Sequence, residues 1–170
     1  MTNGVDPFSN PPALIGRLPK GAGGPRKTLR IMRALVRKCK TDLMLRNLAL
    51  EITRNVPQRD GAGEIRALHA WVRDCIRYVG DIRGVETLHT PRQIVLQAAG
   101  DCDDKSLLLA TLLESINHPT RFVAVGYGAA PSHVLVETRF GPRWVSLETT
   151  ENVPASWYPD RVRRGIVVHN

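Results

Sequence analysis

The sequence predicts an α+β fold, with helices in its N-terminal half and a small antiparallel sheet in its C-terminal half. Residues 28–40, 42–56 and 64–78 repeat apolar side chains every three or four positions, which is the period of amphipathic helices. Residues 106–116 are mostly apolar and complete a fourth, central helix. Four later segments, 121–127, 132–138, 143–150 and 165–170, are rich in valine and other strand-forming residues.

The first helices have residues suited to their starts. Thr28 and Asp42 carry side-chain oxygens that accept a backbone N–H in a first turn, so we expect both as N-caps. In the third helix Cys75 falls on the apolar stripe and His69 does not. We therefore expect Cys75 to be buried and inert, and His69 to lie on the surface.

Length and composition are those of a globular domain. Apolar residues make up 42% of the 170 positions and charged residues 24%, enough for one hydrophobic core. No apolar stretch approaches the roughly 18 residues of a membrane span, and the N-terminus lacks a signal pattern. Synthesis and folding in a cytoplasm are expected. Three widely spaced cysteines without a Cys-x-x-Cys pair predict no disulfide framework, no bound metal and no cofactor.

The net charge of +8 is concentrated near the N-terminus. Residues 1–59 hold 12 basic and 3 acidic residues, whereas residues 60–160 hold 9 basic and 13 acidic ones. Nine basic residues and no acidic residue occur from Arg17 to Lys40. Such a segment could bind an acidic protein, a phosphate backbone or an anionic envelope. The alternative interpretation is that these side chains form a solvated helix face. Without interleaved aromatics, any nucleic-acid binding is expected to be non-specific.

The most informative stretch is Gly-Asp-Cys-Asp-Asp at 100–104, at the start of the central helix. Unpaired N–H groups and the helix dipole stabilise a thiolate there, so Cys102 is the candidate nucleophile. The carboxylates of Asp101, Asp103 and Asp104 act against this stabilisation, so a nearby base is needed.

His133 is the candidate base, and its strand forms a hairpin with the next one. If residues 139–142 connect the strands, Thr138 pairs with Arg143 and His133 lies directly opposite Glu148. A slip of one residue would move Glu148 to the other face. Cysteine, histidine and carboxylate in this order suit a nucleophile, a base and an orienting group.

These motifs resemble those of the transglutaminase-like cysteine enzyme superfamily, including its bacterial and phage members. The resemblance covers about residues 65–150, with Gly-Asp-Cys-Asp-Asp, His-Val-Leu-Val-Glu and Trp-Val-Ser-Leu-Glu-Thr. It implies a papain-like fold in which the nucleophile helix packs on the sheet, with Cys102 as nucleophile, His133 as base and Glu148 as third member. The family usually has aspartate where this chain has Glu148, whose side chain is one methylene longer.

Four more residues are candidates for oxyanion stabilisation or substrate binding. By the resemblance, an aromatic residue upstream of the cysteine assists the oxyanion, which indicates Tyr78 at the end of the predicted third helix. In papain-like enzymes a glutamine before the cysteine has this role, so Gln93 and Gln97 are candidates. Both also suit exposed positions on a short helical turn over 91–98. Asp101, beside the nucleophile, is the fourth.

The sequence therefore predicts a cysteine hydrolase that forms a thioester at Cys102 with a protein or peptide-like substrate. Water as acceptor gives protease, amidase or deamidase activity, whereas an amine would give cross-linking, and the triad does not choose between them.

We expect an extended Pro/Gly-rich arm at 1–25, a basic helical extension at 26–59 and a catalytic domain at 60–170. Resemblance to tailed-phage and prophage proteins implies synthesis in a bacterial cytoplasm, a place in a virion and docking to other subunits through residues 1–40. The alternative is a catalytically silent structural or adaptor protein of a viral assembly, docked through the same arm.

Overall fold

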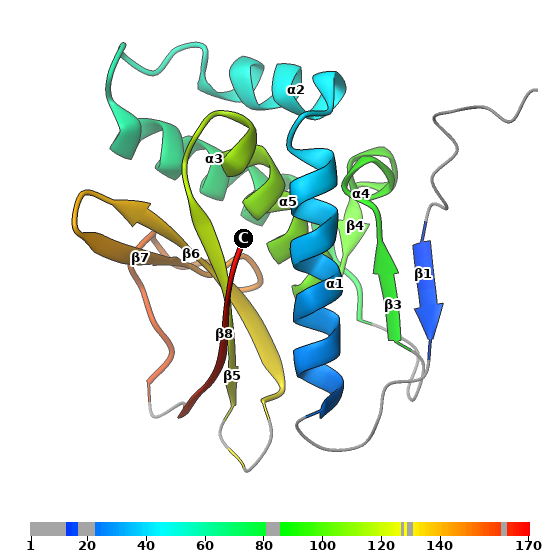
Figure 1. Cartoon of the computed structure of the whole chain (residues 1–170). Coiled ribbons are helices and arrows are strands. Elements are labelled where there is room, and N and C mark those ends of the chain that lie inside the picture. Colours follow the sequence, from blue (N-terminus) through cyan, green and yellow to red (C-terminus); the bar gives the residue numbers. More distant parts are fainter. Residues whose placement is uncertain (1–12, 17–22, 81–85, 127, 129–130, 161–162) are drawn as a thin grey trace, which may run out of the picture.

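A computed structural model describes residues 13–16, 23–80, 86–126, 128, 131–160 and 163–170 (Figure 1). The N-terminal elements are β1 (Ala13–Gly16), α1 (Gly23–Cys39), α2 (Leu43–Thr53), α3 (Gly61–Cys75) and β2 (Arg77–Tyr78). The middle of the chain forms β3 (Glu86–His89), α4 (Pro91–Gln97), β4 (Ala99–Gly100) and α5 (Cys102–Ser115). The last elements are β5 (Thr120–Gly126), β6 (His133–Phe140), β7 (Arg143–Leu147) and β8 (Arg163–His169). The predicted α+β character is confirmed.

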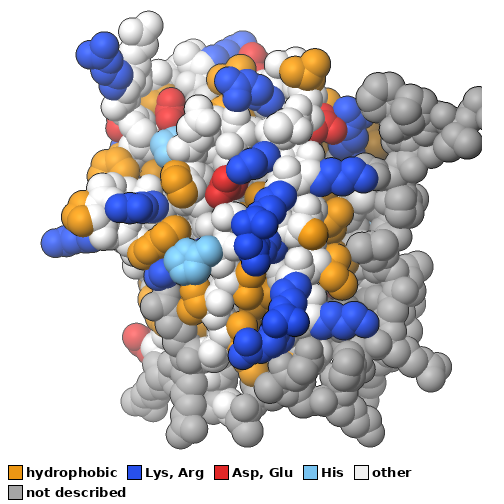
Figure 2. Space-filling view, in the orientation of Figure 1, with side chains coloured by type: hydrophobic (Ala, Val, Ile, Leu, Met, Phe, Trp, Pro, Cys, Tyr) orange, Lys and Arg blue, Asp and Glu red, His pale blue; other side chains and the backbone are white. Residues whose placement is uncertain are grey.

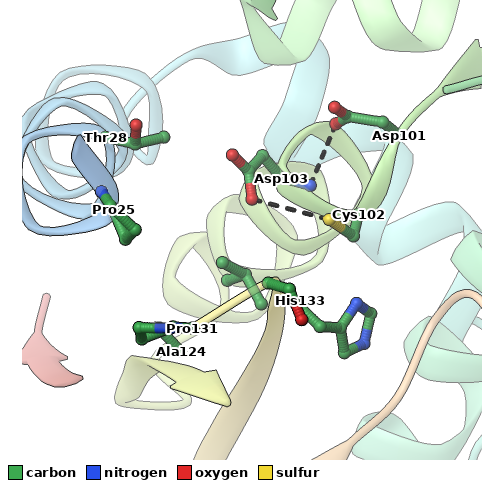
Figure 3. A pocket seen from close by; sticks show the side chains of 10 residues that line it. Pro25, Thr28, Asp101, Cys102, Asp103, Ala124, Pro131 and His133 are labelled. Carbon is green, nitrogen blue, oxygen red and sulfur yellow. Dashed lines mark hydrogen bonds between the residues drawn. The ribbon is translucent and has the colours of Figure 1, made fainter. Parts of the chain in front are cut away.

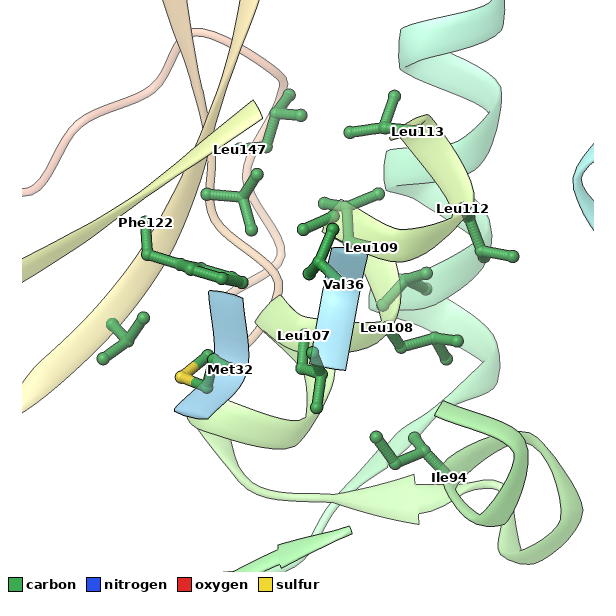
Figure 4. Close-up of a cluster of buried hydrophobic side chains, with 14 of the residues drawn as sticks. Met32, Val36, Ile94, Leu107, Leu108, Leu109, Leu112, Leu113, Phe122 and Leu147 are labelled. Atoms are coloured by element: carbon green, nitrogen blue, oxygen red, sulfur yellow. The ribbon is translucent and has the colours of Figure 1, made fainter. Parts of the chain in front are cut away.

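Helix α5 is the centre of the molecule. The other helices pack around it and the sheet β7-β6-β5-β8, antiparallel throughout, covers its remaining side. A helix that is covered on all sides needs apolar side chains on all sides, which explains the leucines at 107–109, 112 and 113. Figure 4 shows these side chains against neighbours from α1 and the sheet. One buried cluster contains Leu29, Leu45, Leu68, Leu108 and Phe122, so α1, α2 and α3 share a core with α5 and the sheet.

The start of α5 is polar and yet buried, because its side chains have partners. Asp104, which is 2% exposed, accepts the backbone N–H of His89 at 2.8 Å and lies 2.7 Å from that residue's Nδ1. The Ser106 hydroxyl donates to the carbonyl of Val134 at 3.1 Å. These contacts tie the first two turns of α5 to β3 and to β6, the strand that begins at His133.

The β6–β7 hairpin has a different register from the predicted one. Phe140 pairs with Arg143, which leaves a loop of only Gly141–Pro142, whereas we had expected Thr138 opposite Arg143. Gly141 has a φ of 58°, a conformation that glycine adopts without strain, and this permits the tight turn. The register shift is two residues, so each side chain stays on the expected face of the sheet.

Two helix boundaries also differ from the predictions. Helix α1 begins at Gly23, and the Thr28 hydroxyl bonds the Gly24 carbonyl inside the helix instead of capping it. Helix α3 ends at Cys75, which is exposed rather than buried. Tyr78 therefore lies in β2, which pairs in parallel with β4, and not on a helix.

Other predictions are confirmed. Asp42 caps α2 by accepting the backbone N–H groups of Met44 and Leu45. The helical turn expected over 91–98 is α4, and the last strand lies at a sheet edge. Of the predicted arm, residues 13–16 form β1 against β3, and 1–12 and 17–22 lie outside the described residues. In the described part of the chain no helix has the length and hydropathy needed to cross a membrane.

Candidate active site

His133, the first residue of β6, is bonded to Glu148, one residue beyond β7. Their Nε2 and Oε2 atoms are 2.6 Å apart. The Glu148 side chain is 1% exposed and that of His133 26%, so the carboxylate is enclosed while the ring reaches solvent. The last observed pair is Val136–Leu147, and continuing this register by one residue puts Glu148 opposite position 135, two residues from His133, so the contact runs diagonally across the hairpin. The extra methylene of glutamate suits this longer reach.

The Glu148 carboxylate determines where the proton of the neutral His133 ring resides. Burial raises the pKa of Glu148, but hydrogen bonds from His133 and Thr150 outweigh burial, and the pKa lies below its usual value. An ionised carboxylate can only accept, so the Nε2–H of His133 donates. In the neutral ring the lone pair is then on Nδ1, the nitrogen available to take a proton.

Glu148 is held at two further points. Its Oε1 accepts the backbone N–H and the hydroxyl of Thr150, both at 2.7 Å. Its backbone carbonyl accepts from Nε2 of His69, on α3, at 2.5 Å. His69 is 2% exposed, contrary to the prediction of a surface position. Burial lowers the pKa of His69, so its ring is neutral at pH 7 and Nε2 is a donor.

Cys102 is the first residue of α5, and its thiol is directed at Asp103. The distance from Sγ to Oδ1 of Asp103 is 3.7 Å (Figure 3). Burial raises the pKa of the Cys102 thiol, the carboxylates of Asp103 and Asp101 raise it further, and the backbone N–H of Val134 lowers it. The net pKa is far above that of a free cysteine, so the thiol is protonated at neutral pH. The expected stabilisation of a thiolate by the helix start is therefore outweighed.

Two cavities lie beside His133. The first, here called the thiol cavity, has a volume of about 270 Å³ and is lined by Cys102, Asp101 and Asp103 together with residues of α1, β5 and β6. The second, the carboxylate cavity, has a volume of about 480 Å³ and is lined by Glu148 with residues that include Tyr78 and Trp157. His133 lines both cavities, so it is the residue that the thiol end and the carboxylate end of the site share.

Of the four other predicted site residues, one lines each cavity and two lie on α4, outside both cavities. Tyr78 lines the carboxylate cavity. Asp101 lines the thiol cavity and is the N-cap of α5, accepting two backbone N–H groups of its first turn at 2.9 and 3.0 Å. Gln93 and Gln97 line neither cavity and bond each other on α4 at 3.5 Å. Within the described residues no group of three or more His, Cys, Asp or Glu side chains is arranged to hold a metal ion.

Thiol, imidazole and carboxylate thus come from the start of a central helix, the start of a strand and the end of the neighbouring strand. A thiol-bearing helix packed on an antiparallel sheet that carries the other two groups is the layout of papain-like cysteine hydrolases. A family model described as the transglutaminase-like superfamily matches residues 46–149, more than half of the chain. The chain belongs to the transglutaminase-like superfamily.

Solved structures agree with this fold. One, described as a "putative protease" from Parabacteroides distasonis, has 12% sequence identity to this chain and a TM-score of 0.56. Another, described as a "putative cysteine protease" from Cytophaga hutchinsonii, has 15% identity and a TM-score of 0.53. They match 75% and 82% of this chain, which spans 26% and 55% of theirs. Calcium-bound LapG from Legionella pneumophila has 12% identity and a TM-score of 0.53, over 74% of this chain and 75% of its own. At these identities the likeness concerns the fold. No curated protein was found to match the chain.

The sequence analysis did not predict the part that three residues take in the site. His69 lies four positions after Ile65 and three before Val72, both buried, so the apolar period could have revealed its burial. Thr150 follows Glu148 by two positions, the spacing at which a side chain commonly accepts a nearby backbone N–H. Asp103 was recognised as an opposing charge, but its contact with the thiol depends on side-chain direction, which the sequence does not encode in a readable way.

Proposed function

We propose that the protein is a cysteine hydrolase that cleaves a peptide or side-chain amide bond, with Cys102 as nucleophile, His133 as base and Glu148 as the group that orients His133. The observation that carries the proposal is the 2.6 Å bond from His133 Nε2 to the buried Glu148 carboxylate. This bond makes Nδ1 the basic nitrogen of a ring that lines the same cavity as Cys102.

In the proposed mechanism the thiol first turns from Asp103 towards His133. Nδ1 takes the S–H proton as Sγ attacks the carbonyl carbon, which forms a tetrahedral oxyanion. Asp101 already occupies two N–H groups of the first turn, so the N–H of Cys102 itself is the proposed oxyanion donor. The Tyr78 hydroxyl is a second candidate donor. The imidazolium then protonates the leaving amine, and water hydrolyses the thioester with His133 again as base.

A second candidate function is a catalytically silent structural protein that docks through residues 1–40. The raised pKa of Cys102 favours this alternative, because a thiol held protonated by burial and two carboxylates is a weak nucleophile. Incorporation in a phage virion and the division into 1–25, 26–59 and 60–170 remain predictions. The two candidate functions, hydrolase and silent structural protein, differ in whether the reactivity of the Cys102 thiol depends on His133.

The test is the rate of iodoacetamide alkylation of each cysteine, read by mass spectrometry in the wild type and in His133→Ala. Exposed Cys75 serves as the internal reference for reagent and pH. We expect His133→Ala to slow alkylation of Cys102 at least tenfold at neutral pH and to leave Cys75 unchanged. Equal Cys102 rates in the two proteins would refute the base and support the silent alternative.

Incubation with a degenerate peptide library then identifies the reaction. New chain ends indicate a protease, conversion of glutamine to glutamate a deamidase, and joined peptides an acyl transfer to amines. Each product should be absent with Cys102→Ala.

A further inference from the structure

Helix α1 carries a row of basic side chains on its outer face. Arg26, Arg30, Arg33 and Arg37 follow one another at intervals of four, three and four residues, which places them on one side of the helix. We call these four residues the basic stripe. Helix α1 contains no acidic residue. Figure 2 shows Lys and Arg side chains gathered in a column on this face of the molecule, uncovered by the described chain.

The positive charge of the stripe is not neutralised within the described residues. Arg26, Arg30 and Arg37 are exposed, and no ion pair with an acidic side chain is formed by them in the described part of the chain. Arg33 is half-buried, and its Nε is enclosed without a hydrogen-bond partner there. Just beyond the helix Lys40 does have one, Glu114, at 3.2 Å. Among the described residues the stripe is therefore a surface of uncompensated positive charge.

The stripe begins in the same first turns of α1 that contribute two residues to the thiol cavity. Pro25 and Thr28, in the first turns of α1, line the thiol cavity together with Cys102 and His133. Arg26 lies between these two lining residues in the sequence. With a rise of about 1.5 Å per residue, the stripe extends roughly 16 Å along the helix from Arg26 to Arg37.

We propose that the basic stripe binds an acidic stretch of a polypeptide substrate whose scissile bond lies in the thiol cavity. The proposal rests on the proposed function, because it assigns a substrate class to that site. An extended chain rises about 3.3 Å per residue, so five or six residues cover the stripe. Alternate side chains of an extended chain face the same way, so the acidic ones that face α1 meet guanidinium groups, the cations best suited to carboxylates.

The acids at the thiol cavity favour a polypeptide over a nucleic acid. Asp101 and Asp103 line the thiol cavity, to which the first turns of α1 also contribute, and they repel negative charge. A nucleic acid carries a negative charge at every phosphate, so it would bring negative charge next to these two aspartates. A polypeptide can present neutral residues at the scissile bond and acidic residues a few positions away, on α1.

The experiment uses two reactive peptides that differ only in charge. One carries an N-terminal iodoacetyl group, a short glycine spacer and about eight glutamates, and the other has glutamines instead. Sγ of a cysteine displaces iodide from either reagent. At low salt we expect the acidic reagent to alkylate Cys102 about tenfold faster than the neutral one, with no such preference at Cys75. This advantage should disappear near ~1 M salt, where exposed charges are screened.

Two triple variants with the same net charge localise the effect. Arg26→Glu, Arg30→Glu and Arg37→Glu together should bring the ratio of the two rates to about one or below. Arg66→Glu, Arg139→Glu and Arg143→Glu, which change exposed arginines away from α1, should keep the tenfold ratio. Circular dichroism confirms that both are folded. Equal rates for the two reagents in the wild type, or loss of the ratio in both variants, would overturn the proposal.

Failure of the proposed function gives a different result. If His133→Ala leaves Cys102 alkylation unchanged, the mechanism fails, but fluorescent octaglutamate binding to Cys102→Ala still measures the stripe. Loss of that binding in the α1 variant, with retention in the control variant, supports the stripe on its own. Unlabelled octaglutamate and a DNA duplex are compared as competitors for this binding. If the duplex displaces the fluorescent peptide at a lower concentration of phosphate groups than the concentration of carboxylates that octaglutamate needs, the assignment to a polypeptide is overturned.

Discussion

The imidazole of His133 and the carboxylate of Glu148 lie 2.6 Å apart, although the two residues are not partners across the β6–β7 hairpin. Diagonal neighbours in an antiparallel pair have Cα atoms about 7–8 Å apart, against about 4.5–5.5 Å for directly opposed residues. The two methylenes of glutamate cover this extra distance. An aspartate would suit a position directly opposite, so the residue type and the register are matched.

Glu148→Asp should therefore lose the contact even though it keeps the charge. We expect alkylation of Cys102 to fall about tenfold and the free energy of unfolding to fall by about 1–3 kcal/mol, because the buried carboxylate loses its donor. Iodoacetamide labelling and urea unfolding measure the two effects. Glu148→Gln keeps the reach and loses the charge, and should be less destabilised than the aspartate variant. Wild-type reactivity in Glu148→Asp would contradict the importance of reach.

The sequence was sufficient to predict where Cys102, His133 and Glu148 lie in the fold, because each is part of a local motif: a helix start, a strand start and a strand end. Their catalytic roles stay predictions. It was not sufficient for the register, since Gly141 and Pro142 suit both a two-residue loop and the four-residue loop that we expected. The pairs β1–β3 and β2–β4 were missed because they join segments far apart in the chain, and local periodicity contains no signal for such pairing.

The two errors on α3 have one physical origin. The predicted helix ran to Tyr78, which shifted the apparent apolar stripe towards Cys75 and away from His69. In the structure α3 ends at Cys75, and its buried face consists of Ile65, Leu68, His69 and Val72. The raised pKa of the Cys102 thiol was foreseen only as an opposing influence, because its size depends on burial and on the direction of the thiol.

Asp103→Asn should make Cys102 more reactive. Removing this carboxylate takes away a charge that raises the pKa of the thiol, so the pKa falls and the thiolate fraction at pH 7 increases. We expect alkylation about tenfold faster, with the pH–rate curve displaced to lower pH. Asp74→Asn is the control, because Asp74 is exposed and bonds Arg73 instead. An unchanged pH–rate curve in Asp103→Asn would show that the 3.7 Å contact does not control the thiol.

Lys105→Met should destabilise the junction between α3 and α5. The Lys105 side chain is 2% exposed, and its Nζ donates to the carbonyls of Arg73 and Ile76 at 3.0 and 2.6 Å. Methionine has a similar shape but leaves both carbonyls without this donor, so we expect a loss of roughly 2–4 kcal/mol in urea unfolding. Lys27→Met, an exposed change on α1, should stay within about 0.5 kcal/mol. Equal stability of the two variants would mean that the carbonyls find other partners.

His69→Gln should remove one part of the acid sensitivity of the fold. Burial lowers the pKa of His69 below its ordinary value of 6.5, so below about pH 6.5 the unfolded chain binds a proton more readily than the folded one. The stability due to the neutral ring is present above that pH and declines as the pH falls towards the folded pKa. The lowered pKa of Glu148 acts in a second window, starting near pH ~4.3 and continuing downward.

Glutamine keeps an N–H donor for the Glu148 carbonyl but does not titrate. Urea unfolding at about pH 7.5 and about pH 5.5 should therefore show a smaller loss of stability in His69→Gln than in the wild type, while the loss below pH ~4.3 is retained. His169→Gln, at an exposed position of β8, is the matched control and should keep the wild-type difference. If His69→Gln loses as much stability between the two pH values as the wild type, the buried ring does not cause the upper window.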